Sequence, residues 1–496
     1  MSKTAEVGRG GLLLSVGNLT GAFLGFLNTL LLTRLLGGDL YGVYSRVITF
    51  SFLAMSLLNL GEAWALFRFI PDTESKNRLD ERKILISSAL FSRMFYSGIA
   101  GFTFILLSGR IAAYIGREDL TSLILLSGLL VFISPVAGLI YSLPIALRME
   151  GFTVVFKVVM NGLICLLTGI LLKAGQGVRG ALISQIIGNV AAVIVFGMYF
   201  VRLIGFKLLK PHEYLKNDVG LIVHGLPMAM LQVSMASTLE VPLTVFSSAG
   251  SDIDNAILRA SNRYFFAFYI ILSSFGTVLI PHLTSKIKNG EAYAFNRYIG
   301  FFSFLSCGVL SILIGLSGSL LQLLSPTFTD RWVLSIMGLS FPLMFILPLN
   351  MHLAYRGEKK LIGVAPVMLG ASFVASYLMK GYGVRYVAMS YPLSLIVWFS
   401  LILLISGESL SVNSIMRVVL ALCSAAISGM LGYVIDSSNI NLYVRVPSSA
   451  LIVGLSYYTL TILLGIVGRI EAEIIEEMMP DPLSRFLRFY YDLLAR

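Results

Sequence analysis

The chain has 496 residues, of which 57% are hydrophobic and only 13% are charged, and its mean hydropathy is +0.85. This composition excludes an ordinary soluble domain and predicts a membrane protein with many spans. The net charge of +11 does not indicate a nucleic-acid partner. The basic residues lie in short segments beside apolar runs, where attraction to anionic lipid explains them.

Apolar runs of about 20 residues, the length that crosses a bilayer as a helix, follow one another along the chain. The alternating ten-residue pattern of a membrane barrel is missing, so we expect an all-α fold with about 14 transmembrane helices. The predicted spans lie near residues 11–36, 41–70, 84–107, 121–146, 153–173, 181–204, 219–249, 255–285, 298–322, 331–353, 361–379, 386–406, 414–435 and 447–468.

Lys and Arg residues concentrate in the loops that face the same side as the N-terminus. Because cytoplasmic loops carry an excess of these residues, both termini are predicted to be cytoplasmic. We therefore expect a multi-pass protein of the cell membrane, either an inner or a plasma membrane.

The cysteines and histidines show no arrangement suited to a metal. Cys165, Cys307 and Cys423 stand singly within predicted spans, and the four histidines have no ligand spacing. No G-x-x-x-x-G-K-[ST] loop is present for ATP, and no external loop is large enough for a catalytic domain. We expect no metal, no cofactor and no enzymatic activity.

A short pattern, G-x-G-V-R, occurs at residues 175–179 and again at 381–385. Upstream of each copy, "LRMEG" at residues 147–151 and "LAYRG" at 353–357 match in the same register. These matches predict a parallel repeat of six helices, related by an axis along the membrane normal. Chance recurrence of a tight glycine turn is the alternative.

The repeat predicts the domain organisation. An N-terminal six-helix bundle covers residues 1–205, a short basic cytoplasmic linker 206–218, and a C-terminal six-helix bundle 219–406. Two additional transmembrane helices follow within 407–468. Residues 469–496 contain an amphipathic pattern that predicts a cytoplasmic helix on the inner leaflet.

Two stretches carry a resemblance to a known family. Residues 30–53, "LLLTRLLGGDLYGVYSRVITFSFL", resemble the N-terminal signature of the polysaccharide transporter family. Residues 275–291, "FGTVLIPHLTSKIKNGE", look like a second element of its superfamily, the multidrug, oligosaccharidyl-lipid and polysaccharide flippases. The resemblance implies two six-helix bundles, and an alternating-access flippase that moves a lipid-linked oligosaccharide from the cytoplasmic to the external leaflet.

A polyprenyl diphosphate headgroup is anionic, and the planar fork of arginine pairs well with phosphate oxygens. Arginines within spans are therefore the first candidates for the substrate site. Arg259 and Arg263 stand four residues apart on one helical face, with Asn255 and Asn262 nearby. We predict that these four residues bind substrate. The alternative is that both arginines pair with other groups of the protein and have a purely structural role.

Three further arginines could complete a cationic cavity: Arg34, Arg46 and Arg93. Intramembrane charges usually face a cavity or a partner, so each is a candidate substrate-binding residue. For Arg34 and Arg46 the alternative is a side chain that extends to the outer interface or pairs with Asp39.

Two carboxylates, Glu62 and Glu240, also fall within predicted spans and could bind a coupling proton or sodium ion. The alternative, which we favour, is that each neutralises a nearby arginine. Pro227 and Pro242 could interrupt the helix that carries Glu240, as happens at transporter binding sites.

The predicted partners are a lipid-linked oligosaccharide with an anionic phosphate headgroup and the surrounding membrane lipids, with the protein acting as a monomer. Two alternatives share the superfamily. One is a lipid II flippase of peptidoglycan synthesis, which would also have fourteen helices and an anionic substrate. The other is a cation-coupled multidrug exporter, for which twelve helices and a less basic cavity are expected.

Overall fold

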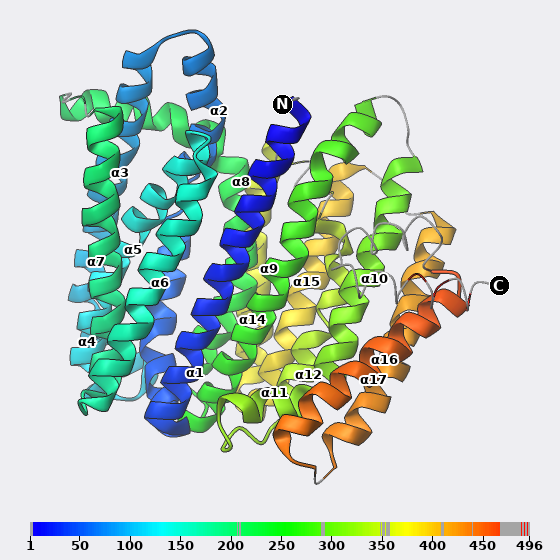
Figure 1. Ribbon diagram of the computed structural model, residues 1–496. Coiled ribbons are helices and arrows are strands. Elements are labelled where there is room, and N and C mark those ends of the chain that lie inside the picture. Colours follow the sequence, from blue (N-terminus) through cyan, green and yellow to red (C-terminus); the bar gives the residue numbers. More distant parts are fainter. Residues whose placement is uncertain are drawn as a thin grey trace. The chain divides into compact units, whose positions relative to one another are not determined.

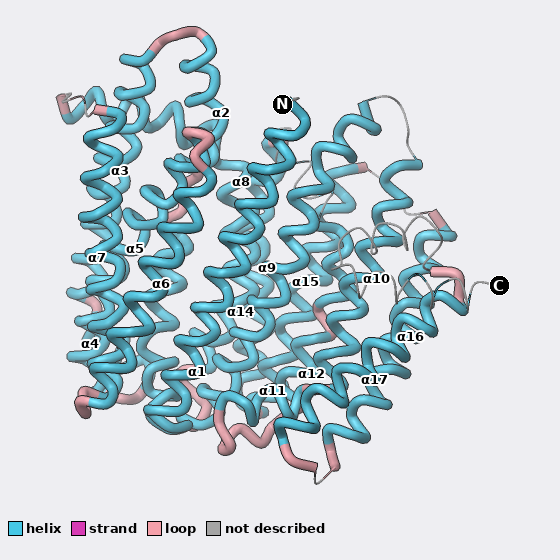
Figure 2. Tube along the Cα trace, viewed as in Figure 1, coloured by secondary structure: helices cyan, strands magenta, loops and turns pink. Residues whose placement is uncertain are grey.

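The computed structural model describes residues 3–205, 207, 210–288, 293–347, 349, 353, 358–407, 411–438, 440–466, 488, 491 and 494. Every regular element in this part of the chain is a helix, and it contains no strand, as Figures 1 and 2 show. The all-α prediction is confirmed. The predicted C-terminal helix within 469–496 lies outside the described residues, apart from the last three named.

The chain divides into two compact units. The first comprises Met1–Arg263 and Leu353–Ser394, and the second comprises Tyr264–His352 and Leu395–Arg496. These units do not follow the predicted domain boundaries, which rest on the sequence repeat and stay a prediction.

The first unit contains most of the N-terminal helices and a segment that returns from later in the chain. Its elements are α1 (Lys3–Leu57), α2 (Glu62–Ser75), α3 (Leu79–Leu106), α4 (Ser108–Ile115), η1 (Glu118–Leu120), α5 (Thr121–Ala146), α6 (Glu150–Lys173), α7 (Gly177–Ile204), α8 (Pro211–Phe246), the start of α9 (Asp252–Lys288), η3 (Lys359–Gly363), α14 (Val364–Met379), η4 (Lys380–Tyr382) and the start of α15 (Val384–Ser406).

Two irregular points divide what the sequence predicts as the first two spans. α1 is kinked at Gly37, whose φ of 77° is favourable only for glycine. The helix then ends at Leu57, and the chain is non-helical until α2 begins at Glu62. The second predicted span, 41–70, is therefore a discontinuous helix. No break occurs at Pro227 or Pro242, because α8 continues through both prolines.

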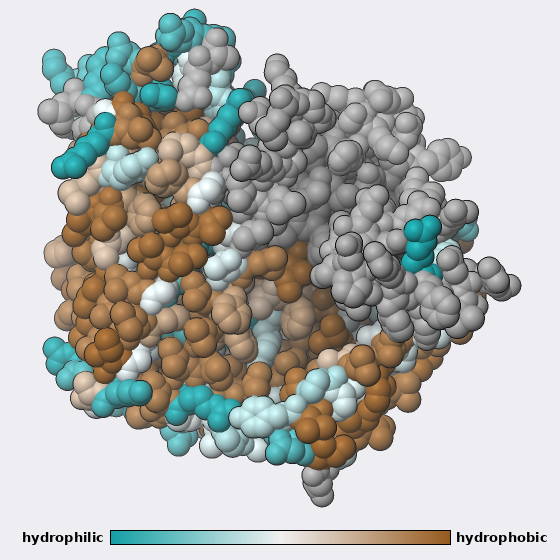
Figure 3. Space-filling view, viewed as in Figure 1, coloured by the Kyte–Doolittle hydropathy of each residue, from teal (hydrophilic) through white to brown (hydrophobic). Residues whose placement is uncertain are grey.

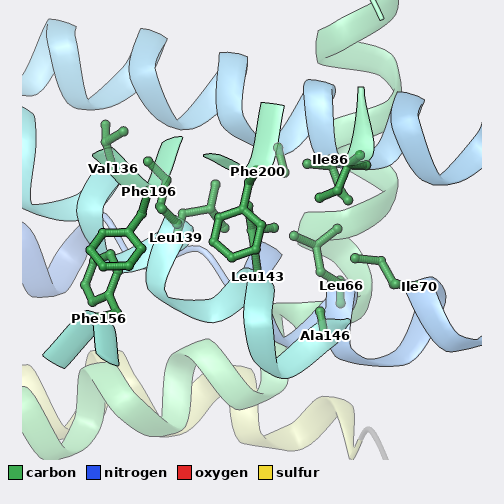
Figure 4. Close-up of a cluster of buried hydrophobic side chains, with 14 of the residues drawn as sticks. Leu66, Ile70, Ile86, Val136, Leu139, Leu143, Ala146, Phe156, Phe196 and Phe200 are labelled. Carbon is green, nitrogen blue, oxygen red and sulfur yellow. The ribbon is translucent and has the colours of Figure 1, made fainter. Parts of the chain in front are cut away.

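An apolar core joins α2, α3, α5, α6 and α7 within the first unit (Figure 4). Phe156, Phe196 and Phe200 are each at most 5% exposed, and the Phe156 and Phe196 rings lie 4.7 Å apart. Leu143, also fully buried, belongs to the same cluster. The visible face over α6 and α7 is largely apolar in its middle, with hydrophilic residues toward the helix ends (Figure 3). This distribution suits helices surrounded by lipid.

The second unit contains the end of α9 and the C-terminal helices. Its other elements are α10 (Tyr293–Gly315), α11 (Ser317–Leu324), α12 (Trp332–Gly338), η2 (Phe341–Ile346), the end of α15, α16 (Val412–Asp436) and α17 (Leu442–Leu463). α10 packs against α16 through small residues, since a Cβ on Gly315 would lie 3.3 Å from the Cα of Gly432. α10 and α11 are joined by a bend of 69°.

Ten described helices are long and apolar enough to cross a membrane, or eleven if the bent pair α10–α11 counts as one span. One of the ten is the 57-residue stretch Gly17–Thr73, and its kink at Gly37 falls between the predicted spans 11–36 and 41–70. The short apolar segment Trp332–Phe345 corresponds to a further predicted span. The total of fourteen stays a prediction.

The G-x-G-V-R pattern has a similar local setting in both copies. The first copy covers the end of the turn between α6 and α7 and the start of α7, and the second covers the end of η4 and the start of α15. Gly177 and Gly383 both have a positive φ and stand at the start of the following helix. The upstream match at 353–357 lies largely outside the described residues, so the six-helix repeat stays a prediction.

Candidate functional site

The side chain of Arg259 lies at the junction of α1, α8 and α9, and the residue is only 1% exposed. Its Nη1 lies 3.0 Å from Oε2 of Glu240 on α8, and its Nη2 donates a hydrogen bond of 2.5 Å to Oγ1 of Thr49 on α1. Both partners come from helices that precede α9 in the chain. The predicted substrate residue and one predicted ion-coupling residue are therefore an ion pair, as the pairing alternative expects.

Arg263 lies one helical turn after Arg259 and is half-buried. The Cζ atoms of Arg259 and Arg263 lie 5.3 Å and 5.4 Å from the ring centroid of Phe52 on α1. Such distances are those of cation–π contacts. The Arg263 guanidinium also lies close to the Tyr41 hydroxyl. We call Arg259, Arg263 and Glu240, with the Phe52 ring, the cationic cluster.

The cationic cluster holds two guanidinium groups and one carboxylate. Among the described residues, no carboxylate forms an ion pair with Arg263. The cluster therefore carries one positive charge that no described side chain balances. An anion brought to it would be held by a partly desolvated guanidinium, where charge-assisted hydrogen bonds are strong.

The two predicted asparagines bond to the backbone. Nδ2 of Asn255 donates to the carbonyl of Ser251, one turn earlier in the chain, at 2.9 Å. Nδ2 of Asn262 donates to the carbonyl of Leu239 on α8 at 3.3 Å. The Leu239 carbonyl also accepts a hydrogen bond of 3.1 Å from the Tyr391 hydroxyl. Both asparagines thus position α9 locally, and a role in substrate binding stays a prediction.

Arg46 is bound to the end of α8. Its Nε lies 2.7 Å from Oδ1 of Asp252, and its Nη atoms donate to the carbonyls of Ser247 and Gly250. A cation in this place is favourable because the C-terminal carbonyls of a helix are partially negative. Arg46 therefore pairs with Asp252 and not with Asp39, and its nitrogens are engaged in holding α1 to the α8–α9 turn.

A second cation, Arg117, joins the same turn. It lies between α4 and η1, and its guanidinium binds Asp119 and Asp252 at 2.9 Å and 3.0 Å. The hydrogen bond to Asp119 is the main cause that raises the pKa of the Arg117 guanidinium above its ordinary value, and the hydrogen bond to Asp252 also raises it.

Arg34 lies exposed on α1 before the Gly37 kink, and its predicted role in substrate binding stays a prediction.

Arg93 and Glu62 form another buried pair. Nη2 of Arg93 on α3 lies 2.5 Å from Oε2 of Glu62, whose side chain is 0% exposed. Glu62 is the first residue of α2, where an acidic side chain favours the helix N-terminus. The predicted substrate arginine and the predicted ion-coupling glutamate are thus partners.

Asp218 on α8 lies near this pair, and the sequence prediction missed it because it placed residue 218 at the end of a cytoplasmic linker. α8 begins instead at Pro211, with the side chain of Glu213 accepting a hydrogen bond of 3.0 Å from the backbone of Lys210. Proline at the first helical position with an acidic residue two positions later is a helix-start signal. With this signal, the sequence would have predicted a helix that includes Asp218.

A largely apolar cavity of about 660 Å³ lies elsewhere in the first unit. α1, α8 and α14 line it together with α4 and Leu107, the residue before α4, and its one charged lining residue is Arg110. Neither Arg259 nor Glu240 lines this cavity. The described residues contain no group of three or more His, Cys, Asp or Glu that could hold a metal.

The helices and their buried charges define a multi-pass membrane protein. A family model described as "Polysaccharide biosynthesis protein" matches residues 7–286, which is more than half of the chain. The chain belongs to this family. Among curated protein sequences, none matches it.

Three solved structures share the fold. A "Lipid II flippase MurJ, inward closed conformation" is similar with a TM-score of 0.71 and 17% identity, covering 91% of this chain and 98% of that one. A eukaryotic MATE transporter, AtDTX14, has a TM-score of 0.61 and 14% identity, covering 85% and 98%. An inward-facing MATE family transporter of the MOP superfamily has 0.55 and 14%, covering 86% and 100%. None of the three is described as an enzyme.

Proposed function

We propose that this protein is a flippase that moves a polyprenyl-phosphate- or diphosphate-linked oligosaccharide from the cytoplasmic to the external leaflet by alternating access. The observation that carries the proposal is the charge balance of the cationic cluster. Two guanidiniums lie near one ring, Phe52, and a single carboxylate, Glu240, is paired with Arg259. A phosphate group would balance the remaining positive charge.

The two arginines of the cationic cluster differ in burial and in their partners. Arg259 is fully buried and bound to Glu240 and Thr49. Arg263 is half-buried and has no carboxylate partner among the described residues. Arg263 is therefore the residue that we propose to contact the phosphate, while Arg259 holds the Phe52 face and adds to the positive potential.

The physical problem of flipping favours this arrangement. Each sugar hydroxyl moved into hydrocarbon without a partner costs several kcal/mol, so the glycan needs a polar passage, whereas the polyprenyl tail can stay in the lipid. Moving about two negative charges outward down an inside-negative potential of 100 mV releases roughly 4 to 5 kcal/mol. Membrane potential can therefore contribute to the drive, and ion coupling is an addition to it.

Three parts of the proposal concern the setting of the protein. The helices span the cell membrane with both termini in the cytoplasm, in agreement with the distribution of Lys and Arg along the sequence. The unit of transport is a monomer. A coupling ion, H⁺ or Na⁺, exchanges for the substrate.

The test is transport in proteoliposomes that contain a fluorescent polyprenyl diphosphate oligosaccharide. Arg263→Ala is expected to reduce the flipping rate at least about tenfold, since a charge-assisted hydrogen bond to phosphate contributes about 1.5 to 3 kcal/mol. Arg263→Lys keeps the charge, and its flipping rate is expected to lie between those of the wild type and Arg263→Ala, because an ammonium cannot form the bidentate contact. Arg202→Ala, which removes an exposed arginine on α7, is the matched control.

Each alternative function predicts a different substrate response. A lipid II flippase would move labelled lipid II, and would lose that activity in Arg263→Ala. A cation-coupled multidrug exporter would move a cationic dye, and would keep or increase that activity when a positive charge is removed. Full flipping of the oligosaccharide lipid by Arg263→Ala would contradict the assignment of the site.

A further inference from the structure

A second buried cluster of charges lies where α2, α3 and α8 pack together. Glu62, Arg93 and Asp218 are 0%, 4% and 3% exposed. Arg93 forms its ion pair with Glu62, as described above. Asp218 is close enough to this pair for Glu62 to repel its carboxylate and for Arg93 to attract it. Two carboxylates therefore lie near one guanidinium, which forms its ion pair with Glu62.

Several oxygens of this cluster lack a hydrogen-bond partner among the described residues. They are Oε1 of Glu62, Oδ1 of Asp218, and the hydroxyls of Ser88 and Ser92, which stand one turn apart on α3. The Ser92 hydroxyl faces the Asp218 carboxylate, although the two do not meet the geometry of a hydrogen bond. Buried polar atoms are satisfied in the great majority of cases, so these free acceptors indicate a site for a cation.

Among the described residues of the surrounding helices, no other charged group acts on the two carboxylates. Glu62 and Arg93 are the charged groups that act on Asp218, and Arg93 is the charged group that acts on Glu62. The Tyr96 ring lies 5.6 Å from the Cζ of Arg93. α5 packs against both α2 and α3 and has a single titratable side chain, Tyr141.

The charge count decides what the cluster binds. With both carboxylates ionised, it carries one negative charge that no described side chain balances. An isolated charge away from water is very costly, and a buried group takes up a counter-charge or is neutralised. One positive charge, and not two, restores balance.

We propose that Glu62 and Asp218, with the hydroxyl of Ser92, form a binding site for one monovalent cation, either a proton or a sodium ion, beside Arg93. The backbone fixes this site closely. Gly61 precedes Glu62 and lies against Gly225 of α8, where a Cβ on Gly225 would be 1.9 Å from the carbonyl oxygen of Gly61. The start of α2 is thereby held against the helix that carries Asp218.

The cation site and the cationic cluster are connected by one helix. α8 carries Asp218 near its start and Glu240 near its end, and 22 residues at about 1.5 Å each separate them by about 33 Å. This is close to the thickness of the bilayer core, about 30 Å. A cation bound at one end and an anionic headgroup bound at the other would each cancel an opposite unbalanced charge. The use of this cation in coupling rests on the proposed flippase function, whereas its binding does not.

The test is the thermal stability of the purified protein in nanodiscs without any lipid-linked substrate. Two arms distinguish the cations: Na⁺ replaces choline at constant ionic strength and mildly alkaline pH, and the pH is lowered in choline without Na⁺. The wild-type protein is expected to gain stability in at least one arm, because a ligand that binds only the folded state raises the midpoint Tm. Asp80→Asn, which changes an exposed carboxylate on α3, is the control and is expected to keep the gain.

The Tm of Asp218→Asn distinguishes a cation site from a carboxylate that only forms a structural hydrogen bond. The substitution makes the cluster neutral, so the Tm of the variant without Na⁺ at alkaline pH is expected to exceed that of the wild type, and the gain in both arms is expected to disappear. Ser92→Ala is expected to weaken the response to Na⁺ and to leave a response to protons unchanged. If Asp218→Asn does not fold, Glu62→Gln replaces it, since it also leaves one carboxylate for one arginine.

Three results would overturn the proposal: a wild-type Tm that responds to neither cation, a full response in the neutralised variant, or a neutralised variant that is less stable than wild type without cation. Because no lipid substrate is present, such a failure leaves the phosphate assignment of Arg263 untouched. Conversely, loss of the flippase assignment would leave cation binding measurable.

Discussion

Gly61 and Gly225 meet backbone to backbone where the discontinuous second span crosses α8. A Cβ on Gly225 would lie 1.9 Å from the carbonyl oxygen of Gly61, and one on Gly61 would lie 2.4 Å from the carbonyl of Gly225. Gly61 also has a φ of 96°, which side chains rarely adopt. Only glycine at both positions allows the two segments to approach this closely.

Gly225→Ala is therefore expected to destabilise the protein by more than the about 1 to 3 kcal/mol typical of an overpacked core, because backbone atoms obstruct the new methyl group. The matched control is Gly220→Ala in the same helix, where a Cβ would meet nothing within 4 Å. That change is expected to be neutral or stabilising, since alanine is the better helix former by about 0.5 to 1 kcal/mol. Thermal unfolding in detergent compares the two. Equal midpoints would contradict the contact.

Arg46 is expected to be a stability residue. Its guanidinium is shared between Asp252 and the carbonyls of Ser247 and Gly250, and removing one partner of a buried ion pair typically costs about 3 to 5 kcal/mol. Arg46→Lys keeps the charge but cannot reach three acceptors in a planar arrangement, so it is expected to recover only part of the loss. The measurement is the unfolding midpoint of both variants. A lysine variant as stable as wild type would show that charge alone is sufficient.

The Arg259–Glu240 pair calls for a double-mutant cycle. Arg259→Met leaves the Glu240 carboxylate without its cation and is expected to be strongly destabilising. Combining it with Glu240→Gln removes both charges, and the double variant is expected to be more stable than Arg259→Met alone. Additive effects on the unfolding midpoint would mean that the two side chains do not interact in solution.

The sequence predicted the helical fold because apolar runs of about 20 residues are a strong signal of membrane-spanning helices. The runs near 121–146 and 386–406 correspond to α5 and α15 almost residue by residue. It did not reveal the break before Glu62, which depends on a glycine contact with a distant helix. Long-range contacts of this kind leave no local pattern.

For several charged residues the sequence identified burial but not the partner, and it chose the exposed Arg34 while missing the buried Asp218. Arg259 with Glu240 and Arg93 with Glu62 were each chosen singly as intramembrane charges, and the structure brings them together as pairs. Asp252, the partner of Arg46, was not selected because it lies between two predicted spans. The pairing depends on how α1, α8 and α9 pack, which no local spacing determines.

Asp436, the last residue of α16, is expected to stabilise the bend between α10 and α11. Its two carboxylate oxygens accept hydrogen bonds of 3.0 Å from the backbone amides of Gly318 and Ser319, in the first turn of α11. These amides would otherwise be unsatisfied, and a negative charge there is favourable at a helix N-terminus. Asp436→Ala leaves them buried and unpaired, at a cost of about 1 to 3 kcal/mol.

Asp436→Asn retains one acceptor oxygen and is expected to lose less stability than Asp436→Ala. Asp39→Ala is the control, because Asp39 is exposed and has no hydrogen bond or ion pair with the described residues. Hydrogen exchange at the amides of Gly318 and Ser319 reports directly on the contact, and faster exchange is expected in both Asp436 variants. Unchanged protection of these two amides in Asp436→Ala would show that another group caps α11 and that the bend does not depend on α16.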